Sequence, residues 1–170
     1  NRDKIDISYN TIDSFSFKYM NSIKTFNEKT KILFVGHLTK GKNIESLLPV
    51  LKKISIKYPL EFILVGDGPE RRNLKDLSEK LGISKIVKFE GFKQQSELSK
   101  YYLDADIFVF PSNYDIWGLV VIEAMVHSLV CITSIHSGVS DDLIENGQTG
   151  YAIDFSNKEE VEKIIIDLIN

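Results

Sequence analysis

The amino-acid sequence predicts an α/β fold in which a doubly wound parallel sheet of about six strands is covered by helices on both faces. From residue 31 onward, short apolar runs alternate with segments whose apolar residues recur at helical spacing. The runs are apolar almost throughout, which is typical of strands buried on both faces of a sheet. Glycine and proline residues, which form turns, separate the runs from the helical segments. This alternation is typical of repeated βαβ units.

The elements follow one another in a regular order. The expected strands are residues 31–35, 61–65, 85–89, 106–110, 130–133 and 151–153. Helices are expected at residues 43–57, 69–81, 96–103, 118–128 and 158–169. Pro59 ends the first helix, Pro69 stands just inside the second, and Gly82 stops it. This order is Rossmann-like, and such sheets bind ligands in the loops at the carboxyl ends of their strands.

Composition indicates an ordinary globular protein and excludes some partners. The chain of 170 residues suits one domain, and its net charge of -3 does not suit a broad nucleic-acid surface. Cys131 is the only cysteine and lies in the apolar run LVCITS, so we expect a small buried side chain and no intrachain disulfide. No apolar stretch reaches the roughly 18 residues of a membrane span, and the first ten residues lack a signal-peptide pattern. We therefore expect a cytoplasmic protein that does not bind nucleic acid.

The loop GHLTKGKN, after the first strand, nearly matches the phosphate-binding pattern G-x-x-x-x-G-K-[ST]. Asn43 replaces the hydroxyl that would hold a metal ion, and Asp67 is the one stand-in for the missing metal-binding acid. Three interpretations stay open at this point. The loop belongs to a P-loop-like NTPase or kinase, it is a glycine-rich turn into a helix capped by Asn43, or its Lys42 binds a diphosphate without a metal ion.

Two further motifs are weaker. Residues 66–68 (GDG) begin like a dinucleotide fingerprint, but Arg71 stands where the third glycine should be, so we interpret them as a βα turn. Residues 104–106 (DAD) match a metal-binding D-x-D motif. They end a helix and open a strand, which places them at the amino edge of the sheet, away from the ligand. We interpret these acids as solvated cap and strand-start residues.

The stretch NYDIWGLVVIEAM, residues 113–125, contains two acids in apolar surroundings. Gly118 starts the expected helix, so the first free N–H groups of this helix would face an anion such as a diphosphate at the ligand edge. Glu123 lies on a helix that is apolar nearly all round, where a bare carboxylate would cost roughly several kcal/mol unless hydrogen-bonded. Glu123 is therefore either a structural acid paired with a basic residue or backbone donors, or a ligand-binding residue. Asp115 is either a turn residue or part of the same site.

Several segments together resemble a known family. They are FVGHLTKGKN, LVGDGPERRNL, VKFEGF, DADIFVFPS, DIWGLVVIEAM, SGVSDDLI and GQTGYAI. In this order and spacing, residues 32–154 resemble the C-terminal, donor-binding domain of GT-B retaining glycosyltransferases, in the family called family 4 or group 1. The fold implied is one half of a GT-B fold.

The resemblance implies a role for individual residues. The family's E-x7-E acids match Asp115, near the transferred sugar, and Glu123, which would bind ribose. An arginine and a lysine that bind the donor diphosphate match His37 and Lys42, and the main chain of residues 92–94 is similar to the segment that meets the base. The implied catalytic residues are Lys42, Asp115 and Glu123. The implied donor-binding residues are Gly36, His37, Lys42, Gly91, Phe92, Asp115, Gly118, Leu119, Glu123, Ser137 and Gly138.

The chain departs from the family pattern at a few positions. Asp115 is one methylene shorter than the usual glutamate. His37 replaces an arginine, so phosphate stabilisation is expected to depend on pH near neutrality. Ser128 and Val130 stand where the family often has glycine and proline, and Ser137 replaces a glycine.

The implied reaction transfers a sugar, with retention, from a nucleotide-diphosphate sugar to an acceptor hydroxyl in polysaccharide, lipopolysaccharide or glycolipid synthesis. UDP is the expected nucleotide, and no metal ion or other cofactor is expected, because cations and a helix end take its place. Residues 1–30 would be the crossover segment from a missing N-terminal acceptor domain, and residues 31–170 the donor domain. A peripheral association of the complete enzyme with the inner membrane is compatible with this assignment. The isolated chain is expected to be inactive or to transfer poorly.

Three other functions stay open beside the transferase. They are a P-loop-like NTPase or kinase, a GT-B sugar-nucleotide epimerase, and a non-catalytic nucleotide-binding domain. Magnesium-dependent ATP binding that needs Lys42 but not Glu123 would favour the first of these.

Overall fold

The computed structural model describes residues 28–170. Most of the expected crossover segment, residues 1–30, therefore lies outside the described residues. Within the described part, the first strand begins at Thr30, one residue earlier than expected.

Within residues 28–170, six strands form one parallel sheet in the order β3-β2-β1-β4-β5-β6. The strands are β1 (Thr30–Val35), β2 (Leu60–Val65), β3 (Val87–Gly91), β4 (Ile107–Phe110), β5 (Val130–Ser134) and β6 (Gly150–Ile153). The order runs outward from β1 in one direction and from β4 in the other, which is the doubly wound arrangement. The predicted fold class is confirmed, and β3 begins two residues later than expected.

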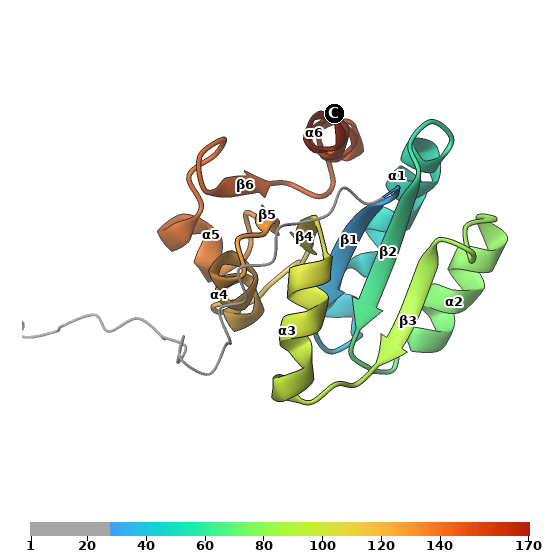
Figure 1. Ribbon diagram of the computed structural model, residues 1–170, viewed down its shortest axis with the longest axis horizontal. Coiled ribbons are helices and arrows are strands. Elements are labelled where there is room, and N and C mark those ends of the chain that lie inside the picture. Colours follow the sequence, from blue (N-terminus) through green and yellow to red (C-terminus); the bar gives the residue numbers. More distant parts are fainter. Residues whose placement is uncertain (1–27) are drawn as a thin grey trace, which may run out of the picture.

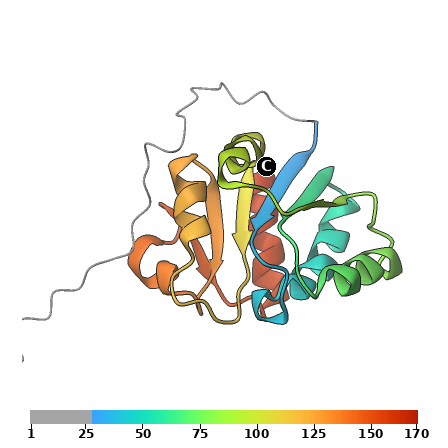
Figure 2. The same ribbon diagram turned by 90° about the horizontal axis from the view of Figure 1, so that it is seen from below.

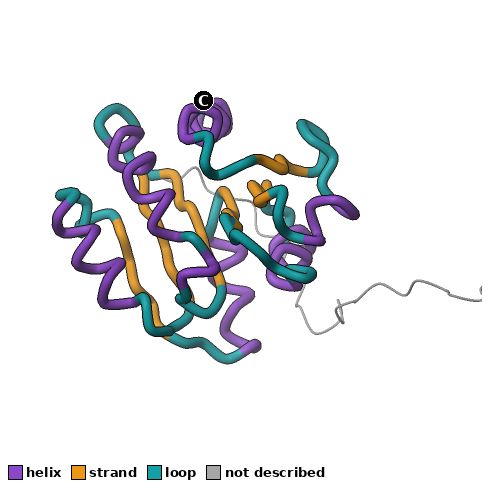
Figure 3. Tube along the Cα trace, turned by 180° about the vertical axis from the view of Figure 1, so that it is seen from behind, coloured by secondary structure: helices purple, strands orange, loops and turns teal. Residues whose placement is uncertain are grey.

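Helices cover both faces of the sheet. They are α1 (Ile44–Ser55), α2 (Arg71–Lys80), α3 (Gln95–Asp104), α4 (Leu119–Val126), α5 (Gly138–Leu143) and α6 (Lys158–Ile169). Helices α3 and α4 lie on one face, and α1, α2 and α6 lie on the other (Figures 1 and 2). Seen from behind, α1 and α2 lie in front of the strands (Figure 3). None of the described helices is long and apolar enough to cross a membrane.

The central strands are buried because both of their faces are covered. In β4 all four residues are buried, and in β1 and β2 the last four are buried, as their continuous apolar sequence predicts. Cys131 in β5 is fully buried, and burial raises the pKa of its thiol to about 12. The thiol is therefore a small apolar side chain at neutral pH, as expected.

Two short elements were not expected. A 3-10 turn (η2, Lys40–Lys42) precedes α1, and α5 has only six residues, too few to show a helical period. One of the three open interpretations of the GHLTKGKN loop was a helix capped by Asn43, and the structure does not show this cap. Asn43 occupies the N-cap position with a left-handed backbone (φ 54°), but its side chain makes no capping hydrogen bond. Instead the Ser46 hydroxyl donates to the Asn43 carbonyl at 2.8 Å.

Both weaker motifs have structural roles, as interpreted. At the amino edge, the Asp106 carboxylate accepts the Lys31 N–H at 2.8 Å and Asp104 accepts the Lys31 ammonium at 2.6 Å, which ties the start of β1 to that of β4. At the carboxyl edge, Gly66 and Gly68 allow the turn after β2 to pack against the turn after β1. A Cβ at Gly66 would lie 1.9 Å from the Gly36 carbonyl oxygen. The glycines therefore allow the loops after β1 and β2 to pack backbone to backbone.

Replacing Gly66 by alanine is expected to lower the free energy of unfolding by about 4 kcal/mol or more, because the new Cβ meets the Gly36 backbone, which cannot move aside. Gly82→Ala is the matched control, since Gly82 also has a positive φ (73°) but a Cβ there would meet no atom of the described residues within 4 Å apart from its chain neighbours. It should cost only about 1–2 kcal/mol for the left-handed backbone. Urea unfolding followed by circular dichroism measures both. Equal stability of the two variants would contradict the close packing of these turns.

Candidate functional site

Lys42 and Asp115 meet at the carboxyl edge of the sheet. The Lys42 ammonium donates to Asp115 Oδ2, and each side chain is about one-fifth exposed. The backbone supports this contact, because the Asn113 N–H donates to the Gly41 carbonyl at 2.8 Å. The Lys42 ammonium also lies 4.8 Å from the centre of the Phe110 ring. The loops after β1 and β4 are thus joined, as predicted for these two residues.

Asp115 is also joined to the loop after β5. Its N–H donates to the His136 carbonyl at 3.3 Å, and its own carbonyl accepts the Gly138 N–H at 3.1 Å. Its second carboxylate oxygen accepts the Trp117 N–H at 3.1 Å. Ser137 lies beside Asp115 in a parallel bridge, so the structure brings together the residues expected near the sugar.

The side chain and the backbone N–H of Ser137 already have hydrogen-bond partners within the protein. Its side chain is buried, donates to the Ser134 carbonyl at 2.8 Å and lies 2.8 Å from the Ser140 hydroxyl. Its N–H donates to the Ser134 carbonyl and the Gly138 N–H to Asp115. These two residues therefore shape the loop, and any direct role toward a sugar stays a prediction.

Gly118 is the N-cap residue of α4, so this helix starts where it was expected to. This residue has a left-handed backbone (φ 89°), and a Cβ there would lie 3.1 Å from the Phe110 ring and 3.2 Å from Val139. Among residues 28–170, no side chain forms a capping hydrogen bond at this helix start. The first N–H groups of α4 are therefore directed to the same edge, and Leu119, the first helical residue, is 42% exposed.

A cleft of about 490 Å³ lies beside this region, at the carboxyl ends of β1, β2 and β3. Three of the predicted residues line it, namely Gly36, His37 and Phe92. The Phe92 side chain is 70% exposed at this cleft. Gly91, also predicted, has a positive φ (73°) and accepts the Gly66 N–H at 2.8 Å, so it shapes the turn that carries Phe92.

Glu123 is 93% buried in the layer between α3 and α4, since only 7% of it is exposed. Its Oε2 accepts the Tyr102 hydroxyl at 2.7 Å, and its Oε1 accepts the Gln95 amide at 3.0 Å. The structural alternative predicted a basic or backbone partner, and the two donors that residues 28–170 supply are neither. Gln95 is exposed and lines the cleft, so it connects Glu123 to that cavity.

Sequence reasoning missed Tyr102 and Gln95. Tyr102 follows Leu98 by four positions on the buried side of α3, so the sequence pattern shows it as an ordinary core residue. Gln95 is the first residue of that helix and has the composition of a surface position. Only the packing of α3 on α4 reveals that both reach Glu123.

Asp67 is held in place by its own turn. One oxygen accepts the Gly68 N–H at 2.8 Å and the other accepts Arg71 at 2.9 Å. These bonds, led by that to Gly68, lower the pKa of Asp67 despite some desolvation. Among the described residues, no group of three His, Cys, Asp or Glu side chains could hold a metal ion.

The comparison with protein families decides the class. A family model described as glycosyl transferases group 1 matches residues 16–170. The chain belongs to this family. The predicted membership of the group 1 glycosyltransferase family is thereby confirmed.

Relatives of this group 1 chain are longer than it is. The uncharacterized glycosyltransferase MJ1607 of Methanocaldococcus jannaschii is 33% identical over 149 residues, which are 82% of this chain and 38% of that protein. The alpha-monoglucosyldiacylglycerol synthase of Acholeplasma laidlawii is 32% identical, over 84% of this chain and 35% of that protein. The chain therefore spans roughly two fifths of the length of the curated relatives it matches.

Solved glycosyltransferase structures share the fold. Anabaena Alr3699/HepE, solved in complex with UDP and glucose, superposes with a TM-score of 0.81 at 24% identity. The match covers 95% of this chain and 46% of that one. At this identity the likeness supports the group 1 fold and not the ligand.

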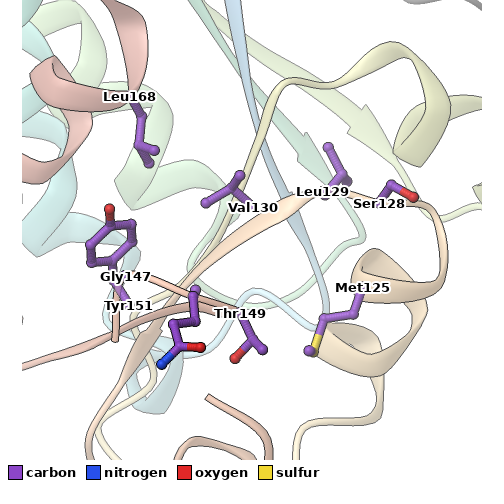
Figure 4. Close-up of a pocket in the computed structure, with 10 residues that line it drawn as sticks. Met125, Ser128, Leu129, Val130, Gly147, Thr149, Tyr151 and Leu168 are labelled. Atoms are coloured by element: carbon purple, nitrogen blue, oxygen red, sulfur yellow. The ribbon is translucent and has the colours of Figure 1, made fainter. Parts of the chain in front are cut away.

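A second cavity, of about 450 Å³, lies at the amino edge of the sheet. Its lining comes from the end of α4, the starts of β5 and β6 and the end of α6, with Met125, Val130 and Leu168 among the residues (Figure 4). Ser128, where the family often has glycine, lies on its wall with a left-handed backbone (φ 60°). None of the predicted site residues of this group 1 chain lies there.

Replacing Glu123 by alanine is expected to lower the free energy of unfolding by about 2–4 kcal/mol, because the buried Tyr102 hydroxyl loses its acceptor and a cavity opens. Asp104→Ala is the control, since its exposed ion pair with Lys31 should change stability by no more than about 1 kcal/mol. Urea midpoints of the two variants give the comparison. A Glu123→Ala variant as stable as Asp104→Ala would contradict the buried network.

Proposed function

We propose that this chain binds the donor in a glycosyl transfer reaction, a nucleotide-diphosphate sugar. The observation that carries the proposal is the Lys42–Asp115 ion pair beside the uncapped start of α4. The Phe110 ring connects the two features, since the Lys42 ammonium lies over this ring and Gly118 packs against it. A cation and a helix N-terminus at one point suit a diphosphate.

The remaining groups would take the other parts of the donor. Glu123 would accept hydrogen bonds from ribose hydroxyls, and the backbone near Phe92 would meet the base in the 490 Å³ cleft. His37, which lines the same cleft, would face the diphosphate. Asp115 would lie beside the sugar and hold Lys42 in place. UDP is the proposed nucleotide, as the resemblance of the sequence to the family implies.

The chemistry proposed is transfer to an acceptor hydroxyl with retention of configuration. When the bond between the sugar and the diphosphate oxygen breaks, negative charge grows on the diphosphate. Lys42 and the start of α4 would stabilise this charge without a metal ion, because they are in place before it develops. The acceptor and its binding domain would belong to a longer protein, and a glycan or glycolipid product is favoured by relatives such as the glucolipid synthase. The chain alone would therefore bind donor weakly and transfer poorly.

Thermal unfolding with a panel of UDP, GDP, ADP and their sugars tests donor binding. A ligand at 100 times its dissociation constant should stabilise the chain by about 2.7 kcal/mol. Lys42→Ala should weaken binding about tenfold or more through loss of a charge-assisted hydrogen bond. Lys40→Ala, in the same 3-10 turn but exposed, is the matched control and should bind as the wild type does. Binding of magnesium-ATP that needs Lys42 but ignores Glu123→Ala would instead support an NTPase.

His37→Arg is expected to lower the dissociation constant of a nucleotide sugar about tenfold, because an arginine at this position of the cleft carries a fixed positive charge and a forked donor toward the diphosphate. Titration calorimetry of the variant and the wild type measures both dissociation constants. An unchanged dissociation constant in His37→Arg would remove His37 from the diphosphate site.

A further inference from the structure

The two oxygens of the Glu123 carboxylate have partners of different kinds. On one side, Oε2 accepts the hydroxyl of Tyr102, whose side chain is fully buried. On the other side, Oε1 accepts the amide of Gln95, which is exposed and lines the 490 Å³ cleft. One partner is therefore out of reach of solvent, and the other stands where solvent and a ligand can enter.

The buried side is rigid. The Tyr102 ring stacks on His127 with 5.0 Å between ring centres and packs against Phe108 at 6.0 Å. At the end of α4, the His127 Nδ1 lies 2.7 Å from the Glu123 carbonyl oxygen, and its Nε2 lies 3.2 Å from the Ser99 hydroxyl of α3, so α3 and α4 are joined at a second point. Burial, with the charge of Glu123, raises the pKa of Tyr102, which keeps this hydroxyl a donor at all ordinary pH values.

The exposed side can exchange. A carboxylate oxygen has two lone-pair positions, so each oxygen of Glu123 can accept a second hydrogen bond. The Gln95 amide is uncharged and ends an exposed side chain, so water or a ligand hydroxyl can replace it at small cost. A ribose diol is a pair of adjacent hydroxyl donors, which suits one carboxylate.

We propose that Tyr102 is a positioning residue that fixes the Glu123 carboxylate for the ribose of the donor, while Gln95 is a replaceable donor that the ribose hydroxyls displace. The proposal rests on the proposed function, because it requires a ribonucleotide in the cleft. Tyr102 would not touch the ligand. It would hold Oε2 so that the Glu123 carboxylate cannot rotate. This carboxylate would therefore be fixed in position before the donor binds.

The contrast between the partners argues against a purely structural pair. Burying a carboxylate is costly, and the two donors found here, a hydroxyl and an amide, are both uncharged. A glutamine or an apolar residue would fill the same space without that cost. An acid held by one permanent and one exposed donor keeps acceptor capacity toward the cleft.

The test measures binding of UDP, GDP and ADP, and of their 2′,3′-dideoxy counterparts, to the wild-type chain and to Tyr102→Phe. The substitution removes the hydroxyl and keeps the ring against His127. For whichever ribonucleotide binds, the dissociation constant should rise about tenfold. The dissociation constant of the dideoxy counterpart should change less than twofold, because this nucleotide lacks the hydroxyls that would donate to Glu123.

Tyr101→Phe is the matched control. It removes the neighbouring exposed hydroxyl, which donates to Glu90 at 2.9 Å, and both affinities should stay unchanged.

Gln95→Ala completes the comparison. Loss of this replaceable donor should leave the affinity for the ribonucleotide within twofold of the wild type or increase it, in contrast to Tyr102→Phe.

Two results for Tyr102→Phe would overturn the proposal. An equal loss of affinity for the ribonucleotide and its dideoxy counterpart would show a merely structural role, and no loss of affinity for either would show that Tyr102 does not position Glu123. If the wild-type chain binds none of the three ribonucleotides, the proposed function itself fails and this inference falls with it.

Discussion

The parallel pairing of β1 with β4 is the constraint on which the candidate site depends. Ile32 pairs with Ile107 and Leu33 with Phe108, so the loops that follow these strands leave the sheet side by side. They lead to α1 and α4, which lie on opposite faces (Figure 2). Strand order reverses at this point, and open sheets of this kind bind ligands there. The Lys42–Asp115 ion pair bridges the two loops although its members are 73 residues apart in sequence.

The elements were predictable because their signals are local. Continuous apolar runs marked the central strands, and helical spacing marked α1 and α6 within a residue or two of their observed bounds. The site was predictable only in part. Gly118 could be placed at a helix start from its sequence context, but the partners of Glu123 come from α3, 21 and 28 positions away. Contacts between helices depend on how they pack, and no local pattern of Tyr102 or Gln95 carries that information.

The departures from the family pattern are absorbed by local chemistry. Ser137, in place of a glycine, donates its hydroxyl to the Ser134 carbonyl and lies within hydrogen-bond distance of Ser140, so the extra polar atom is buried with partners. Ser128 keeps the left-handed backbone that glycine adopts more readily, which explains why glycine is common there. Ser128 lies on the wall of the second cavity, at the amino edge, whereas Ser137 lies beside Asp115 at the carboxyl edge.

Asp115 shows how a shorter acid changes the distribution of charge at this edge. With one methylene fewer than glutamate, its carboxylate stays over its own turn, where one oxygen accepts the Trp117 N–H and the other accepts Lys42. Both oxygens are thus engaged before any donor arrives, whereas Glu123 keeps an exchangeable partner on one side. An incoming diphosphate would share Lys42 with Asp115 at a position where both side chains are about one-fifth exposed and solvent screens the pair. The effect of Asp115 on a donor would therefore pass mainly through the lysine it holds, and that of Glu123 through its own oxygens.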